Sequence, residues 1–294
     1  MHKEITEALS EWYKVNAINK YADRAYLFGS LINEGGESFW PTGVRTSDID
    51  LLIRINPERD TAVKRAAGLE ELKGLMPQIE SKIDTILTRE PDQKGSVLSV
   101  LPVTWYELYH CIHKGFDPKI FTLNIFFDIV NMEQRDGGLS DYIDKSYQFD
   151  NTETFAVMRL CQSLRNSFMK QDDKGEEVLE PFIGIMAIPK ELMRAAALLK
   201  YVETDGEQPK TRTSLLEGEE YFAKLLERRK SEDEKIAELD EKVRRRRSTS
   251  VHTKPPLEPI DLVLACELLF DEAKELSQPS VRETIDRMRR LANG

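Results

Sequence analysis

The sequence predicts an α+β fold, with a mixed α/β domain over residues 1–150 followed by an all-α domain over residues 151–294. Up to about residue 150, short apolar runs alternate with helical patterns, which is typical of strands joined through helices. From Thr152 onward, apolar side chains recur at steps of three and four residues, and no strand pattern is found. This change of pattern predicts the boundary near residue 150.

The mixed half reads as helix, strand, strand, helix, strand, helix and strand. Ile5, Leu9 and Trp12 recur at helical spacing and predict a first helix over 3–20. A second helix should end before Pro77, because proline disrupts a helix interior. The expected elements after the first helix are strands at 24–29 and 47–55, a helix at 59–76, a strand at 81–89, a helix at 102–115 that Gly115 ends, a strand within 119–132 and a turn at 135–138.

The second half contains only helical patterns and one linker. Pro189 stands at a favoured first-turn position of its helix. Residues 248–259 are rich in proline, which indicates an extended loop. The expected helices are at 152–168, 189–202, 217–247, 260–276 and 279–292.

Charge and composition exclude several classes of protein. The net charge is −10, so the surface as a whole should repel nucleic acid, and the only dense basic run is Arg244-Arg245-Arg246-Arg247. No apolar run is long enough to span a bilayer, and the N-terminus lacks the apolar core of a signal peptide. The three cysteines are far apart in apolar surroundings, which indicates buried thiols in a reducing compartment. We therefore expect a cytoplasmic protein without a membrane segment.

Two acids interrupt an apolar strand. Residues i and i+2 of a strand point to the same face, so Asp48 and Asp50 should project together while Ile49 and Leu51 point into the core. Paired carboxylates repel each other and lose hydration unless a cation neutralises them. Mg²⁺ prefers such oxygen ligands, usually together with substrate phosphates. The pattern therefore favours a magnesium site over a solvated edge strand.

A Gly-Ser pair comes directly after the preceding strand. Glycine allows the backbone to approach a phosphate closely, and the serine can add a hydroxyl and an N–H group. The combination of Phe28-Gly29-Ser30 with Asp48-Ile49-Asp50 resembles the nucleotidyltransferase superfamily typified by DNA polymerase beta. The resemblance covers the first half of the chain, and the two motifs are specific in combination.

The resemblance implies transfer of a nucleoside monophosphate from an NTP, such as ATP, to an acceptor with release of pyrophosphate. Gly29, Ser30 and Ser47 would bind the nucleotide. Asp48, Asp50 and a third carboxylate would be the catalytic residues and would hold two Mg²⁺ ions, with Mn²⁺ as an alternative metal. Asp84, expected on the strand at 81–89, is the preferred third ligand, and Asp128 is the alternative.

The spacer between the two motifs departs from the family pattern. Residues 31–46 form a longer insertion than the family usually has, and they include two adjacent glycines and Phe39-Trp40. The helix that normally follows Gly-Ser is therefore expected to be short and followed by a flap. The two aromatic residues could stack on a base or anchor the loop.

The acceptor stays open at the level of the sequence. A toxin or antiviral defence enzyme acting on an RNA end or a protein hydroxyl is preferred, because Arg244–Arg247 would suit a large anionic partner. Aminoglycoside nucleotidyltransferases and cyclic-oligonucleotide synthases are the enzymatic alternatives. A catalytically silent nucleotide-binding module is the non-enzymatic one.

A second cluster of metal-binding residue types is His110, Cys111 and His113. As half of a zinc site it lacks a second pair of ligands, so a structural role is expected.

Overall fold

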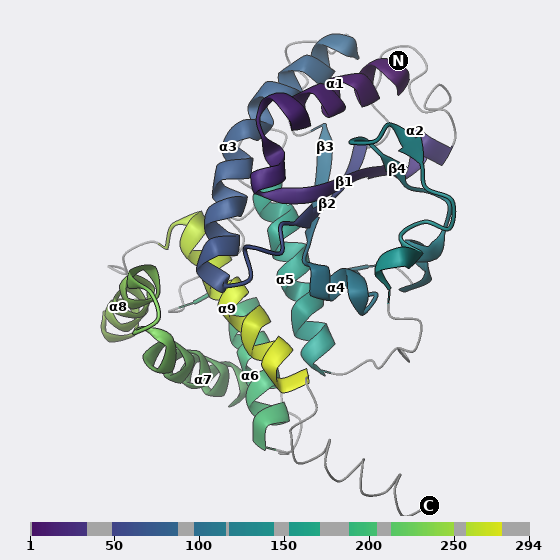
Figure 1. The fold of residues 1–294 in the computed structure, drawn as a ribbon. Coiled ribbons are helices and arrows are strands. Elements are labelled where there is room, and N and C mark those ends of the chain that lie inside the picture. The colour runs from purple at the N-terminus through teal and green to yellow at the C-terminus, as the bar shows by residue number, and fades with distance from the viewer. Residues whose placement is uncertain are drawn as a thin grey trace, which may run out of the picture.

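A five-stranded sheet forms the centre of the first half of the chain (Figure 1). The fold is seen in a computed structural model that describes residues 2–33, 49–87, 97–115, 118–143, 153–170, 188–204, 213–249 and 257–277. The strand order is β3-β2-β1-β4-β5. The strands are β1 (Ala22–Phe28), β2 (Ile49–Ile55), β3 (Leu98–Val103), β4 (Phe127–Asp128) and β5 (Glu133–Gln134).

The sheet is mixed because of one crossover. β1 pairs antiparallel with β2 and with β4, whereas β3 pairs parallel to β2. A parallel connection requires the chain to return across the sheet, and the long helix α3 (Ala62–Ile86) makes this return. The α+β fold class predicted from the sequence is therefore confirmed.

The two faces of the sheet are covered differently. Ile49, Leu51 and Ile53 of β2 lie in a large core that includes apolar residues of α1 (His2–Val15) and α3. The alternate residues point to the other face, where Leu52 packs with Tyr26 and other residues in a smaller core. The short elements of the first half are Ile18–Lys20, α2 (Ser30–Asn33), α4 (Trp105–Tyr109), Pro118–Thr122 and Ser140–Tyr142.

The prediction of a strand at 81–89 is wrong. Helix α3 continues through Pro77 and includes this segment as far as Ile86. Leu69, Leu72, Met76, Ile79 and Ile83 are all buried at steps of three and four residues, so packing of one continuous apolar stripe outweighs the local cost of the proline. The third strand is instead β3, which the sequence reading assigned partly to a helix.

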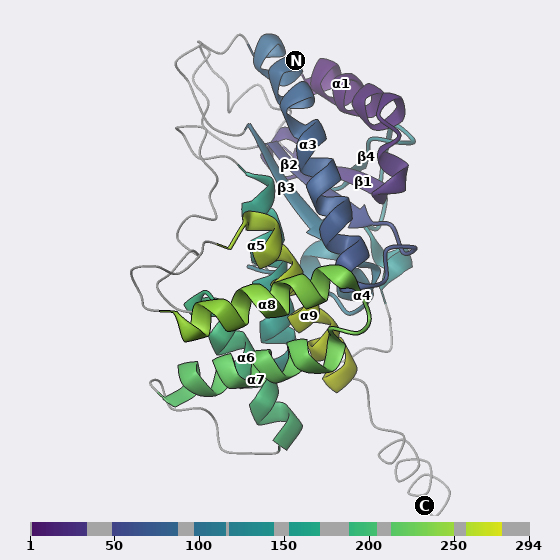
Figure 2. The same cartoon turned by 90° about the vertical axis from the view of Figure 1, so that its left-hand side faces the viewer.

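The helical half lies below the sheet in Figure 1. Its helices are α5 (Glu153–Met169), α6 (Lys190–Thr204), α7 (Thr213–Arg229), α8 (Glu234–Ser248) and α9 (Pro259–Ser277). The single helix expected at 217–247 is in fact two, α7 and α8, which lie side by side in Figure 2. Asp233 begins α8 by accepting a hydrogen bond from the Lys235 N–H at 2.9 Å. The helix expected at 279–292 and residues 250–256 of the Pro-rich linker lie outside the described residues.

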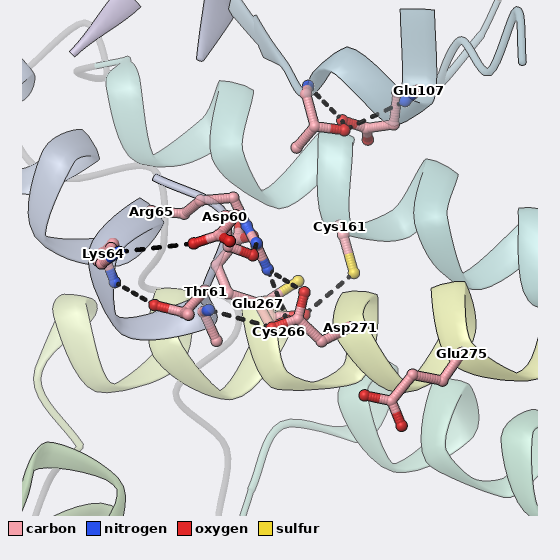
Figure 3. Close-up of polar contacts among 12 residues, drawn as sticks. Asp60, Thr61, Lys64, Arg65, Glu107, Cys161, Cys266, Glu267, Asp271 and Glu275 are labelled. Carbon is pink, nitrogen blue, oxygen red and sulfur yellow. Dashed lines mark hydrogen bonds and ion pairs between the residues drawn. The ribbon is translucent and has the colours of Figure 1, made fainter. Parts of the chain in front are cut away.

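Buried ion pairs join the two halves. Arg165 of α5 is fully buried and forms ion pairs with Glu107 of α4 at 2.7 Å and with Glu267 of α9 at 2.5 Å. Arg65 of α3 pairs with Glu267 at 2.6 Å and with Asp271 of α9 at 2.5 Å (Figure 3). Each arginine thus connects helices from different parts of the chain.

The same junction contains two of the cysteines. Cys161 of α5 and Cys266 of α9 are buried free thiols, and the Cys161 thiol donates a hydrogen bond to the Cys266 carbonyl oxygen at 3.2 Å (Figure 3). Cys111 is a free thiol as well. Among the helices that the structure describes, none combines the length and apolar character required to cross a membrane.

Candidate active site

The Gly-Ser turn lies against the acidic strand. Phe28, the last residue of β1, pairs with Asp50 of β2, and Gly29 follows with a φ of +79°. A Cβ atom on Gly29 would lie only 2.6 Å from Asp50 Oδ2, so this position accepts no side chain while Asp50 keeps its place. Ser30 then begins the short helix α2. The structure therefore places Gly29 and the start of α2 beside Asp50.

Asp50 points away from the large core. Its neighbours Ile49 and Leu51 are buried in the core beneath α1 and α3, so the alternation of the strand directs Asp50 to the opposite face. Asp50 is half-buried there. Ser47, Asp48 and the aromatic pair of the spacer lie outside the described residues, so the pairing of Asp48 with Asp50 stays a prediction.

Asp84 does not lie on a strand beside Asp50. It belongs to the last turn of α3, the helix that packs against the Ile49 and Leu51 face of the sheet. Asp50 projects from the other face. The argument that placed Asp84 as the third ligand depended on a neighbouring strand, so that argument is wrong.

Asp128, the alternative third ligand, closes a turn. It lies on β4, is 1% exposed, and pairs with Tyr26 rather than with a residue at the end of β1. One carboxylate oxygen accepts hydrogen bonds from the N–H groups of Val130 and Asn131 at 2.8 and 3.1 Å, and the other accepts from the Asn131 side chain at 3.0 Å. Both carboxylate oxygens of Asp128 therefore accept hydrogen bonds from residues of this turn.

The strand position next to Asp50 is a serine. Ser99 of β3 pairs with Asp50 and is 9% exposed. Among the described residues, which do not include Asp48, no group of three His, Cys, Asp or Glu side chains could hold a metal ion.

Lys114 lies within electrostatic reach of both Asp50 and Lys170. Lys114 follows α4 and is half-buried, and Lys170 directly follows α5. Burial lowers the pKa of Lys114, the positive charge of Lys170 lowers it further, and the Asp50 carboxylate opposes both effects. The sequence reading did not identify either lysine.

A polar stripe on α5 holds the segment that carries Lys114. The Lys114 N–H donates to Gln162 Oε1 at 2.7 Å, and the Lys114 ammonium donates to Asn166 Oδ1. Gln162 and Asn166 of α5 and Lys170, which directly follows the helix, come after one another at steps of four residues. This spacing was the signal in the sequence that could have located this side of the site.

The exposed arginines of the run Arg244–Arg247 form ion pairs with carboxylates of the same protein. Arg244 pairs with Asp240 and Glu227, Arg245 with Glu241, and Arg247 with Glu219 at 2.9 Å. Arg246 is only 3% exposed, and burial lowers its pKa. The three exposed arginines thus form ion pairs on α7 and α8, as a solvated helix surface would.

His113 has a structural environment. It is 4% exposed, and its Nδ1 accepts a hydrogen bond from the Gly115 N–H at 3.2 Å. Burial, with a smaller contribution from Lys114, lowers its pKa to about 4. These contacts support the structural role expected for this histidine.

Comparison with models of protein families gives a match over most of the chain. A family model described as "Pol beta superfamily nucleotidyltransferase in conflict systems" matches residues 8–275. The match extends from α1 to α9 and thus includes both halves of the chain. No significant match was found among curated proteins or among solved structures.

Proposed function

The chain belongs to the Pol beta superfamily nucleotidyltransferases of conflict systems, and on this basis we propose that it moves a nucleoside monophosphate from an NTP to an acceptor hydroxyl. The acceptor oxygen forms a bond to the α-phosphorus, the bond from that phosphorus to the bridging oxygen breaks, and pyrophosphate leaves. The observation that carries the proposal is the packing of Gly29 against the Asp50 carboxylate.

Gly29 and Ser30 would receive the triphosphate. With no side chain on Gly29, the backbone can approach the phosphates closely while Asp50 stays beside them. The Ser30 N–H group, at the start of α2, would donate to a phosphate oxygen. Ser47 is proposed as an additional contact because it directly precedes the acidic pair.

Asp48 and Asp50 would hold Mg²⁺. Carboxylate oxygens are the ligands that this ion prefers, and the Gly29 position leaves the Asp50 carboxylate the space that a Cβ atom would fill. When bound, Mg²⁺ supplies charge neutralisation on the phosphates and polarisation of the phosphoryl group. The identity of a third ligand is not part of the proposal, since Asp84 and Asp128 have other structural positions.

The acceptor is proposed to be an RNA end or a protein hydroxyl. The conflict-system family favours a macromolecular target over a small drug. Arg244–Arg247 remain the proposed contact for RNA, although phosphates would have to displace carboxylates such as Glu219 and Glu227 from the exposed arginines. An aminoglycoside or a second nucleotide as acceptor would be an alternative outcome of the experiment below.

In the decisive experiment, the protein is incubated with Mg²⁺ and each NTP labelled at the α-phosphate, alone and with total RNA or a protein extract. The molecule that receives the label is then identified. Wild-type protein should transfer label, and Asp50→Asn should abolish transfer without unfolding. Asp84→Asn is the matched control, because it makes the same chemical change on α3 and should retain transfer. Equal transfer by wild type and Asp50→Asn would contradict the proposed site.

A second comparison tests the RNA contact. Replacing Arg244, Arg245 and Arg247 with Gln should weaken RNA labelling and flatten its dependence on salt, because phosphate contacts release counterions. Equal labelling of RNA by both proteins at two salt concentrations would exclude the arginine run as the RNA contact.

A further inference from the structure

A pocket lies where the two halves of the chain meet, away from the candidate active site. Its walls come from the segment after β2, the start of α4 and the second half of α9, and the space between them is about 490 Å³. This volume lies within the range of about 300–1,000 Å³ that is usual for small-molecule sites. Ile55 at the end of β2 lines the pocket, whereas Asp50 lies near the start of that strand, about 17 Å away along it. The pocket is therefore separate from the region that contains Gly29 and Asp50.

Aromatic side chains form much of the lining of this pocket. Phe270 of α9 is buried, Tyr106 of α4 is half-buried, and Trp105 of α4 is 46% exposed. Trp105 stacks on Tyr109, with the ring centroids 4.8 Å apart. The Tyr106 hydroxyl shares a hydrogen bond of 2.7 Å with the Ser277 hydroxyl, which joins α4 to the end of α9. An exposed indole that is already held by stacking is a surface on which a further planar ring, such as a nucleobase, can stack.

Lys274 of α9 supplies a positive charge to the same pocket. Its ammonium lies 5.7 Å from the centroid of the Tyr106 ring, and within the described ranges of the chain no carboxylate forms an ion pair with it. The other two cations of the lining have such partners, since Arg65 pairs with two carboxylates of α9 and Arg59 with Glu71 at 3.7 Å. An anionic group on a ligand would give Lys274 a partner of this kind, beside aromatic rings that can receive a base.

We propose that this pocket is a second nucleotide-binding site, in which the base stacks on Trp105 and the phosphate pairs with Lys274. The chemistry that it recognises is one base joined to one phosphate group. A free mononucleotide and an unpaired nucleotide of an RNA strand both carry this unit. The bound nucleotide contacts α4 of the first half and α9 of the helical half, so binding stabilises the junction between them. The site needs neither Mg²⁺ nor the transfer reaction, and the inference does not rest on the proposed function.

The test measures binding of adenosine monophosphate to the full chain by calorimetry in the presence of EDTA, which removes the Mg²⁺ that the candidate active site would require. Trp105→Ala should weaken binding by roughly 10- to 100-fold, the effect of losing the stacking of one base, and Trp105→Phe should recover part of the loss. Lys274→Met should weaken binding by roughly 10-fold, because a charge-assisted hydrogen bond is lost. Lys235→Met removes an exposed charge from α8 and is the matched control, with unchanged affinity expected.

Three further ligands separate the contributions of the base and the phosphate and identify the source of the nucleotide. Adenosine lacks the phosphate, so it should bind equally to the wild-type and Lys274→Met proteins. Ribose 5-phosphate lacks the base, so it should bind equally to the wild-type and Trp105→Ala proteins. A trinucleotide RNA that binds more tightly than adenosine monophosphate, and loses affinity in Trp105→Ala, would identify RNA as the source. Tighter binding of adenosine monophosphate would identify the free nucleotide.

Folded Trp105→Ala and Lys274→Met proteins with wild-type affinity for adenosine monophosphate would overturn the inference, as would a wild-type protein that binds neither this ligand nor the trinucleotide. Asp50→Asn should bind adenosine monophosphate as the wild type does. Loss of affinity in that variant would assign the binding to the candidate active site and would also overturn the inference. The thermal midpoint of each variant without ligand separates lost binding from lost folding, and the wild-type midpoint should rise with ligand concentration by mass action.

Discussion

At the scale of single residues, Gly29 determines the geometry of the candidate site. Its positive φ ends β1 in a conformation that L side chains rarely adopt, and its missing side chain leaves room for the Asp50 carboxylate. One residue thus satisfies a backbone requirement and a chemical one. The two requirements can be separated by experiment, because the backbone conformation affects stability and the space beside Asp50 affects nucleotide transfer.

Gly29→Ala should reduce nucleotide transfer far more than it reduces stability. The backbone strain costs about 1–2 kcal/mol, whereas the added Cβ must displace the Asp50 side chain. Gly74→Ala is the control, since nothing lies within 4 Å of its Cβ position in α3, and it should raise stability by about 0.5–1 kcal/mol. Thermal unfolding and label transfer are measured on both. A folded Gly29→Ala protein with full activity would contradict the site geometry.

His113 should make stability depend on pH. Its pKa in the folded protein is about 4, against an ordinary value of 6.5, because burial disfavours the charged form. Between these values the unfolded chain binds more protons, so the free energy of unfolding is highest above pH 6.5 and falls as the pH decreases towards 4.

Between pH 7 and pH 5 this histidine should remove about 2 kcal/mol of stability, at roughly 1.4 kcal/mol per pH unit. His113→Asn keeps an acceptor for the Gly115 N–H but cannot titrate, so its urea midpoint should decrease less over the same interval. Parallel pH profiles for the two proteins would exclude His113 as the cause.

At the scale of elements, buried charges connect helices that are distant in sequence. Arg165 connects α5 to α4 and α9, and both of its carboxylate partners are fully buried. Burial raises the pKa of Glu107, while the two arginines hold the pKa of Glu267 below its usual range in spite of burial. Removing Arg165 leaves the buried Glu107 carboxylate without its arginine and leaves Glu267 with Arg65 alone.

Arg165→Met should destabilise the protein by about 3–5 kcal/mol, the usual cost of removing one partner of a buried ion pair. Arg244→Met is the matched control, because the Arg244 side chain is 53% exposed and its ion pairs should contribute no more than about 1 kcal/mol. Urea unfolding monitored by circular dichroism measures both. Similar losses of unfolding free energy in the two variants would show that burial does not determine how much an ion pair stabilises the protein.

At the scale of the whole molecule, one hydrophobic core extends through both halves. It includes Leu51 of β2, Met158 of α5 and Leu262 of α9. Helix α5 packs along β3, and α9 packs against both α3 and α5. The first half of the chain therefore depends on the helical half for part of its core, whatever boundary the chain has near residue 150.

A fragment of residues 1–150 should not fold cooperatively alone, because it exposes the surfaces of α3 and β3 that α5 and α9 cover. Near-ultraviolet circular dichroism of the fragment should show no cooperative transition. Addition of fragment 151–294 should restore a cooperative transition. A fragment 1–150 that unfolds with the midpoint of the full chain would show that the first half is independent.

Local patterns allowed much of the fold to be predicted. The helix α1, the strands β1 and β2 and the helices α5, α6 and α9 follow from apolar residues that recur at the spacing of a helix or form a short apolar run. The proximity of Gly29 to Asp50 followed from the two motifs, since adjacent antiparallel strands bring these positions together. The family match confirms the class of enzyme that the two motifs predicted.

The amino-acid sequence by itself determined the class of enzyme, the glycine turn and the acid beside it, because these depend on short-range spacing along two strands. Only the tertiary structure decided that α3 passes through Pro77, that Asp84 therefore lies on a helix, and that the Lys114 ammonium donates a hydrogen bond to Asn166 of α5. The physical reason is that these outcomes depend on packing between distant segments. A buried stripe along α3 outweighs one proline, and two amides on α5 hold a lysine from another part of the chain.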